Sequence, residues 1–164
     1  VSALCREIAG RFRSEAVDVV AGPVLGGIVL SQWTAHHLSG PDREVLSVYA
    51  EKTPEGGFAL RRGYDQLVRG RRILVVEDIL TTGGSLRDAI RAVENAGGIV
   101  AGAAALVNRG GVTAADVGNP ARLETLVDLP LDSWDASDCP LCAAGVPFDT
   151  DVGKAGKAAG GRKA

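Results

Sequence analysis

Residues 71–95 read RRILVVEDILTTGGSLRDAIRAVEN, and this stretch decides the fold. Residues 73–76 form a wholly apolar run rich in β-branched side chains, as expected of a strand buried on both faces of a parallel sheet. Leu86, Ile90 and Val93 then recur at helical spacing. The stretch therefore predicts a strand, a loop and a helix in that order.

The predicted loop is rich in groups that bind anions and sugars. It carries two carboxylates, then hydroxyls and glycines: Glu77, Asp78, Thr81, Thr82, Gly83, Gly84 and Ser85. Glycines allow close backbone approach, and the free N–H groups of a helix's first turn favour a phosphate. Carboxylates at a strand's carboxyl end can accept hydrogen bonds from vicinal sugar hydroxyls. Together these groups predict a site for ribose 5-phosphate, although any α/β protein can carry a polar turn before a Ser-capped helix. Valine at Gly83 is expected to weaken phosphate binding while the fold survives.

The segment VVEDILTTGGS resembles the phosphoribosyl pyrophosphate (PRPP) signature of the type I phosphoribosyltransferases. It matches neither the P-loop, which needs GxxxxGK[ST], nor the dinucleotide fingerprint GxGxxG. The resemblance implies an α/β fold with a mostly parallel central sheet of about five strands and helices on both faces. It also implies that residues 77, 78 and 81–85 bind the ribose and phosphate of PRPP. Mg²⁺ is the implied cofactor, carried by PRPP and water rather than by a metal site of the protein.

A second strand and glycine loop precede the first. Residues 17–21 form an apolar strand, followed by Gly22-Pro23, Gly26-Gly27 and a helical segment from about 28 to 38. Such a turn can offer N–H groups to another anion, or it can simply allow tight packing. GPVLGGI resembles the pyrophosphate loop of orotate phosphoribosyltransferases. The resemblance implies that Gly26, Gly27 and Lys52 bind the pyrophosphate.

Residues 53–64, TPEGGFALRRGY, have too little hydrophobic content for a core and predict a mobile loop or hairpin. A solvated turn is the plainer interpretation. No partner for Arg61 or Arg62 is evident in the sequence, so pyrophosphate is their expected partner. YAEK followed by LRRGY resembles the short-loop branch of orotate phosphoribosyltransferases. That resemblance implies catalytic roles for Lys52, Arg61, Arg62 and Asp78, and a homodimer, because the loop often reaches the neighbouring subunit's site.

The segment 98–107 is another apolar strand, and it ends in Asn108-Arg109. An Arg at a strand's carboxyl end can fork onto a carboxylate or a carbonyl-rich ring, or it can pair with a structural carboxylate. The family resemblance implies that Arg109 and Thr81 contact the base. An Asp usually precedes this Arg in the family, and Asn108 stands here instead.

Composition limits the remaining possibilities. The chain has 164 residues, 46% hydrophobic content and a net charge of -2, which predict one domain and no nucleic-acid partner. No apolar run reaches the roughly 18 residues of a membrane span, so a cytoplasmic protein without membrane contact is expected. We expect residues 1–148 to form the phosphoribosyltransferase domain and the Gly/Ala/Lys tail 149–164 to be disordered. Cys139 and Cys142, in CPLC, are expected to lie in coil without an assigned function.

The resemblance implies the transfer of a phosphoribosyl group from PRPP to orotate, giving orotidine 5-monophosphate and pyrophosphate in UMP biosynthesis. Orotate enzymes carry an amino-terminal hood over the base. About sixteen residues precede the first core strand here, so we expect the hood to be absent or shortened. Two alternatives stay open at this stage: a purine phosphoribosyltransferase, and a PRPP-binding regulator without base chemistry.

Overall fold

The computed structural model describes residues 1–135 and 137–147, so the expectation for residues 149–164 lies outside the described part of the chain. The chain divides into two compact units, Val1–Leu131 and the part that begins at Asp132. Each unit is described by itself.

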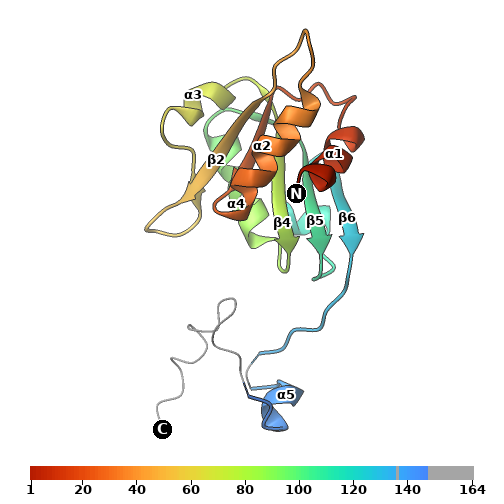
Figure 1. Ribbon diagram of the computed structural model, residues 1–164. Helices are drawn as coiled ribbons and strands as arrows, with labels where there is room; N and C mark the ends of the chain where they lie inside the picture. Colours follow the sequence, from red (N-terminus) through yellow and green to blue (C-terminus); the bar gives the residue numbers. More distant parts are fainter. Residues whose placement is uncertain (136, 148–164) are drawn as a thin grey trace. The chain divides into compact units, whose positions relative to one another are not determined.

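The first unit is built on one sheet (Figure 1). Its elements are α1 (Ser2–Arg11), β1 (Val19–Pro23), α2 (Gly26–Leu38), β2 (Leu46–Lys52), β3 (Phe58–Ala59), α3 (Tyr64–Val68), β4 (Arg72–Leu80), α4 (Gly84–Asn95), β5 (Ile99–Asn108), η1 (Ala114–Val117) and β6 (Leu123–Asp128). The sheet has six strands in the order β3-β2-β1-β4-β5-β6. Every neighbouring pair is parallel except β2 and β3. The predicted mostly parallel α/β sheet is confirmed, with a two-residue antiparallel edge strand added to the five parallel ones.

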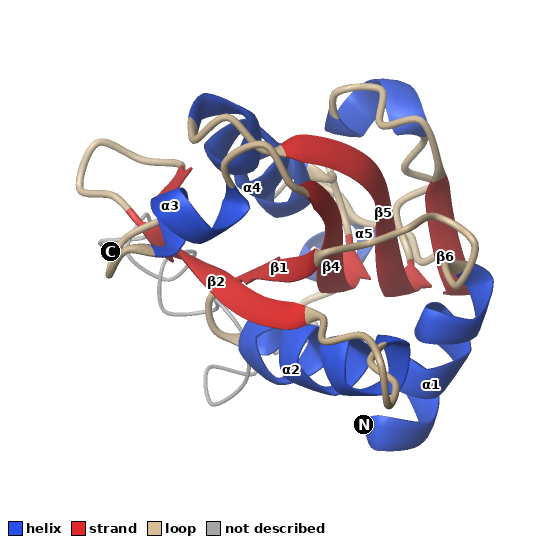
Figure 2. Ribbon diagram, turned by 90° about the horizontal axis from the view of Figure 1, so that it is seen from above, coloured by secondary structure: helices blue, strands red, loops and turns tan. Residues whose placement is uncertain are grey.

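Helices cover both faces of this sheet. Figure 2 shows α1 and α2 on one side and α3 and α4 on the other. Val20 and Leu74 belong to the apolar cluster formed with α1 and α2. Their chain neighbours Val19 and Val75 belong to the cluster formed with α4. Because successive strand residues point to opposite faces, β1 and β4 must be apolar on both, as the run at 73–76 predicts.

The order of the strands fixes where a ligand can bind. From β1 the chain crosses to β2 on one side, and later it returns to β4 on the other side of β1. The loops that follow β1 and β4 therefore leave the sheet in opposite directions at its carboxyl edge. Open α/β sheets bind ligands at this kind of switch point.

Several elements extend further than their apolar runs predict. Strand β4 continues through both acids to Leu80, and Glu77 pairs with Ala105 of β5. The two carboxylates thus belong to the strand and not to the loop after it. Strand β2 likewise runs on to Lys52, and α2 begins at Gly26, inside the predicted loop.

The basic segment forms a hairpin. Strand β3 pairs antiparallel with β2, with Ala59 opposite Glu51 and Phe58 opposite Lys52. Of the two predicted forms, mobile loop or hairpin, the structure has the hairpin. Its mobility stays a prediction.

The second unit contains the CPLC sequence. Cys139 is the N-cap of a short helix, α5 (Pro140–Ala143), and its sulfur accepts a hydrogen bond from the Cys142 N–H at 3.4 Å. The expectation of coil was wrong at these residues. This N–H lowers the pKa of Cys139, whereas burial raises the pKa of Cys5 in the first unit. Among the described helices, none has the length and apolar character needed to cross a membrane.

Candidate active site

The two predicted anion loops meet at the switch point. A Cβ atom at Gly26 would lie 2.2 Å from Oδ2 of Asp78, so a side chain at this position would displace the Asp78 carboxylate. The first loop is also folded tightly on itself, since a Cβ at Gly22 would lie 2.4 Å from the carbonyl oxygen of Gly27. The backbone of the predicted pyrophosphate loop thus lies directly against a predicted ribose-binding carboxylate.

The two acids of β4 have different surroundings. Glu77 is only 6% exposed, and its Oε1 accepts a hydrogen bond from the N–H of Asp78 at 3.0 Å. Asp78 is exposed, and its Oδ1 accepts a hydrogen bond from the N–H of Ile79 at 2.7 Å. The two side chains point to opposite faces of the strand, and burial on both faces ends after Glu77, since Ile79 is exposed as well as Asp78. Asp78 is therefore the carboxylate that an arriving sugar can reach first.

The predicted phosphate loop has the free donors that an anion needs. Gly83, in the left-handed region with φ +74°, is the N-cap of α4, so Ser85 is not the cap. In the described chain, no hydrogen bond engages the N–H groups of Ser85 and Leu86. The hydroxyl-bearing residues Thr81 and Thr82 are exposed beside them. A helix N-terminus with free N–H groups and nearby hydroxyls favours a phosphate.

The basic residues lie at the end of β2. Lys52 is exposed there, and the N–H of Val24 donates to the carbonyl of Ala50 at 3.0 Å, which brings the pyrophosphate loop against this strand. Arg61 is exposed and has no side-chain partner among the described residues.

Arg62 does have a partner. Its Nε lies 2.5 Å from Oε1 of Glu51, and this hydrogen bond raises the pKa of the Arg62 guanidinium. Nothing in the sequence indicated this partner, and pyrophosphate as the ligand of the two arginines stays a prediction.

Arg109 lies beside the phosphate loop. Its N–H donates to the carbonyl of Leu80 at 2.9 Å, and a Cβ at Gly110 would lie only 1.6 Å from the carbonyl oxygen of Thr81. The structure therefore brings together the two residues predicted to contact the base. The Nε of Arg109 is buried without a partner, and no ion pair engages this side chain in the described part of the chain. The alternative of a structural carboxylate partner is not observed there. A buried donor without a partner costs roughly 1–3 kcal/mol, which a bound acceptor would recover.

Asn108 has a role that sequence reasoning missed. Its Nδ2 donates to the carbonyl of Val112, and its Oδ1 accepts from the N–H of Val112, both at 2.9 Å. An amide side chain can donate and accept in this way at any pH, whereas an ionised carboxylate can only accept, so Asn108 braces the loop that carries Arg109. An Asn before an Arg-Gly-Gly turn was the available signal.

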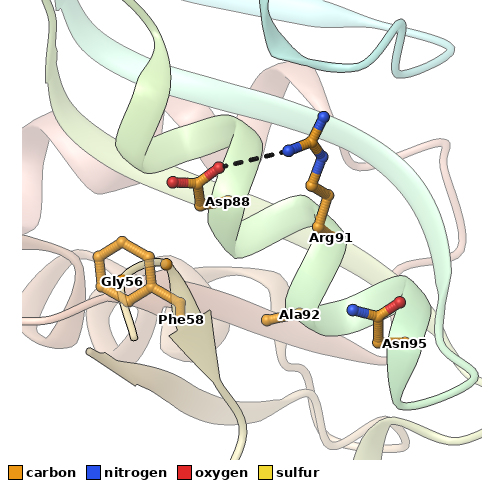
Figure 3. A pocket seen from close by; sticks show the side chains of 7 residues that line it. Gly56, Phe58, Asp88, Arg91, Ala92 and Asn95 are labelled. Atoms are coloured by element: carbon orange, nitrogen blue, oxygen red, sulfur yellow. Dashed lines mark ion pairs between the residues drawn. The ribbon is translucent and has the colours of Figure 1, made fainter. Parts of the chain in front are cut away.

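Two hollows lie away from these loops, on either side of Phe58. One has a volume of about 330 Å³ and lies between the hairpin and α4, where Asp88 and Arg91 form an ion pair at 3.9 Å (Figure 3). The other, of about 280 Å³, shares Phe58, Ala92 and Asn95 with it. Neither is lined by residues of the loops that follow β1, β4 and β5, so the candidate site is distinct from both.

Comparison with known proteins agrees with this arrangement. Residues 2–139 match the model of the phosphoribosyl transferase domain, and the chain belongs to the phosphoribosyltransferase family. It is 43% identical over 144 residues to the orotate phosphoribosyltransferase of Pelotomaculum thermopropionicum, a match that covers 88% of this chain and 70% of the relative. It is 41% identical over 138 residues to that of Thermus thermophilus, covering 84% and 70%.

Solved structures give the same result. The orotate phosphoribosyltransferase of Mycobacterium tuberculosis in complex with PRPP is 28% identical, with a TM-score of 0.63 over 78% of this chain and 72% of that one. The adenine phosphoribosyltransferase of Thermoanaerobacter pseudethanolicus, at 20% identity and a TM-score of 0.63, shares the fold. The match covers 77% of this chain and 79% of the adenine enzyme's chain.

The neighbouring glycines of the phosphate loop provide a matched pair of substitutions. A Cβ at Gly83 would lie 2.7 Å from Val117 and 2.9 Å from Val112, whereas the nearest atom to a Cβ at Gly84 is 3.5 Å away. We expect Gly83→Ala to lower the free energy of unfolding by about 1–3 kcal/mol, through the clash and the positive φ. Gly84→Ala should change it by less than about 1 kcal/mol. Urea denaturation measures both, and equal stabilities would contradict this account of the loop.

The same contacts change the expectation for Gly83→Val. The fold as well as phosphate binding should suffer, because both valines are buried. Phosphate affinity should therefore be compared between variants only at temperatures where circular dichroism shows that each is folded.

Asn108→Asp should destabilise the loop at neutral pH. The introduced carboxylate would face the carbonyl oxygen of Val112 instead of donating to it, at a cost of about 1–3 kcal/mol. This repulsion should raise the pKa of the new carboxyl in the folded state above its unfolded value of about 3.9. The protonated form can donate, so the stability deficit should shrink as the pH falls through that raised pKa and grow as it rises.

The exposed Asn119 offers a control for this experiment. Thermal unfolding between pH 4 and 8 should show a pH-dependent deficit for Asn108→Asp and little change for Asn119→Asp. A deficit that does not vary with pH would mean that the amide bridge is not what braces the loop.

Proposed function

We propose that this chain is an orotate phosphoribosyltransferase, which transfers the phosphoribosyl group of PRPP to orotate and releases orotidine 5-monophosphate and pyrophosphate in UMP biosynthesis. The observation that carries the proposal is the buried, unpartnered Nε of Arg109 beside Thr81, at the edge of the phosphate loop. Orotate carries a carboxylate, which an arginine can bind through two parallel hydrogen bonds. The identity to orotate phosphoribosyltransferases over most of the chain supports the same base.

The proposed roles follow the positions of the loops. The loop 81–85 binds the 5-phosphate through hydroxyls and the free N–H groups of α4. Asp78, with Glu77, accepts hydrogen bonds from the ribose hydroxyls. Gly26, Gly27 and Lys52 bind the pyrophosphate, and the hairpin arginines add positive charge. Little proton transfer is required, so catalysis consists of positioning and of charge stabilisation around an oxocarbenium-like transition state.

Mg²⁺ fits this site as part of the bound substrate. Asp78 uses Oδ1 to accept a hydrogen bond, and its Oδ2 faces Gly26 between the two anion loops. A carboxylate oxygen is a ligand that hydrated Mg²⁺ accepts, directly or through water, while phosphate oxygens supply the rest. The ion would offset the charge that develops on the leaving pyrophosphate. Lys52 and the free N–H groups of the phosphate loop would orient the substrate around it.

The test is turnover of a panel of bases. We expect the purified protein, with PRPP and Mg²⁺, to convert orotate and to leave uracil, adenine, guanine and xanthine unchanged. Arg109→Gln should reduce kcat/KM for orotate by roughly ten- to a hundredfold, since a charged hydrogen bond to the substrate is lost, while PRPP binding by calorimetry stays unchanged. Arg91→Gln, on the exposed side of α4, is the control. Turnover of adenine instead of orotate would support a purine enzyme, and PRPP binding without any turnover would support a regulator.

The homodimer and the cytoplasmic location are also proposals. Because Arg62 pairs with Glu51 of its own chain, we expect the hairpin to serve its own subunit's site. A chain carrying Arg61→Ala and Arg62→Ala, co-expressed with a chain carrying Asp78→Asn, should then be inactive, since every site keeps one defect. If the hairpin instead serves the neighbouring subunit, a mixed dimer would contain one fully intact site. That site would combine the intact hairpin of one chain with the intact Asp78 of the other. Recovery of activity would therefore overturn the own-chain arrangement.

A further inference from the structure

The ion pair between Glu51 and Arg62 joins the end of β2 to the return segment of the hairpin. The Nε–Oε1 distance is 2.5 Å, and the side chains are 25% and 65% exposed. Exposed ion pairs of this kind contribute little to the free energy of unfolding. We therefore consider which groups the Glu51–Arg62 pair holds in place. Glu51 directly precedes Lys52, a residue proposed to bind pyrophosphate.

A second contact fixes the same segment. Arg62 and Gly63 both have left-handed backbones, with φ +60° and +82°, and the Tyr64 N–H closes the turn on the carbonyl of Arg61 at 3.0 Å. The ring of Tyr64 then packs edge-on against Tyr49 of β2, with centroids 5.2 Å apart. A left-handed arginine is unfavourable by itself, so contacts on both sides of it are needed to hold this conformation.

The guanidinium of Arg62 is only partly used. An arginine has five N–H donors, and within the described residues only the Nε–H of Arg62 has a partner. The Nη groups are left to bind an anion. The end of β2 is also where the pyrophosphate loop attaches, through the hydrogen bond from Val24 to Ala50, the residue before Glu51.

We propose that Glu51 is a positioning residue, which holds the Arg62 guanidinium by its Nε edge so that its Nη edge binds the pyrophosphate of PRPP. The inference deepens the proposed function and rests on it. Glu51 does not touch the substrate. It removes the freedom of a long side chain before the substrate arrives, and this preorganisation strengthens binding.

Electrostatic repulsion alone predicts the opposite change in pyrophosphate affinity when Glu51 is replaced. The direction of that change therefore tests the proposal. Glu51 is a negative charge near a site for a polyanion, so its removal alone should strengthen pyrophosphate binding. A latch that kept Arg62 away from the substrate would have the same result on removal. Only a positioning role makes the loss of the carboxylate weaken binding.

The experiment is calorimetric titration of the full chain with magnesium pyrophosphate, PRPP and ribose 5-phosphate. Glu51→Gln should bind pyrophosphate and PRPP roughly tenfold more weakly, the size of a typical coupling between interacting side chains. Its affinity for ribose 5-phosphate should not change, because that ligand occupies the loop after β4 and not the end of β2. This second ligand also shows that the variant is folded. Glu55→Gln, an exposed hairpin glutamate with no side-chain partner in the described chain, is the charge-matched control and should behave as the parent.

A double-mutant cycle separates positioning from a general effect. In an Arg62→Ala background, Glu51→Gln should produce no further loss of pyrophosphate affinity. In turnover assays, Glu51→Gln should raise the KM for PRPP and leave the KM for orotate unchanged.

Three results would overturn the role of Glu51: unchanged or tighter pyrophosphate binding in Glu51→Gln, losses that add in the double variant, or an equal loss in Glu55→Gln. A parent protein that binds no PRPP and converts no base would instead overturn the proposed function.

Discussion

The site depends on close packing between the loop after β1 and the end of β4, at the switch point of the sheet. Gly26 leaves room for the carboxylate of Asp78, and a side chain at that position would displace this carboxylate. A similar approach, of Gly110 to the carbonyl of Thr81, joins the loop after β5. The main chain of the loop after β1 thus packs against the Asp78 carboxylate, and the main chain of the loop after β5 packs against that of the loop after β4. Their donors converge because the sheet places the strand ends side by side.

The parts of this arrangement that follow local rules could be read from the sequence. The apolar run at 73–76 and the helical spacing of Leu86, Ile90 and Val93 predict strand, loop and helix, and the structure has all three. The extent of β4 could not be read in this way. Glu77 and Asp78 interrupt the apolar pattern, and only the pairing of residues 77–80 with β5 shows that the strand continues. The end of a strand is decided by its pairing with a distant segment of the chain. The sequence of the strand alone does not reveal that pairing.

The contacts of Arg62 and Asn108 were missed for a related reason. Arg62 meets Glu51, which lies eleven positions earlier, only because β3 pairs antiparallel with β2 and the following turn is left-handed. The side-chain amide of Asn108 closes a short loop by donating to and accepting from the backbone of Val112. These two hydrogen bonds depend on the path of the next four residues. The residue types were compatible with several partners, and tertiary geometry selected one.

The free donors of the phosphate loop have a consequence for how this family can diverge. The N–H groups of Ser85 and Leu86 belong to the main chain, so proline is the only substitution at these positions that removes one of them. In the proposed site, phosphate binding therefore depends mainly on the path of the backbone. The proposed recognition of the base depends instead on a side chain, Arg109, which a single codon change can alter. Under this proposal the acceptor base can change while the donor site persists; the fold itself is shared with an adenine phosphoribosyltransferase at 20% identity and with an orotate phosphoribosyltransferase at 28%.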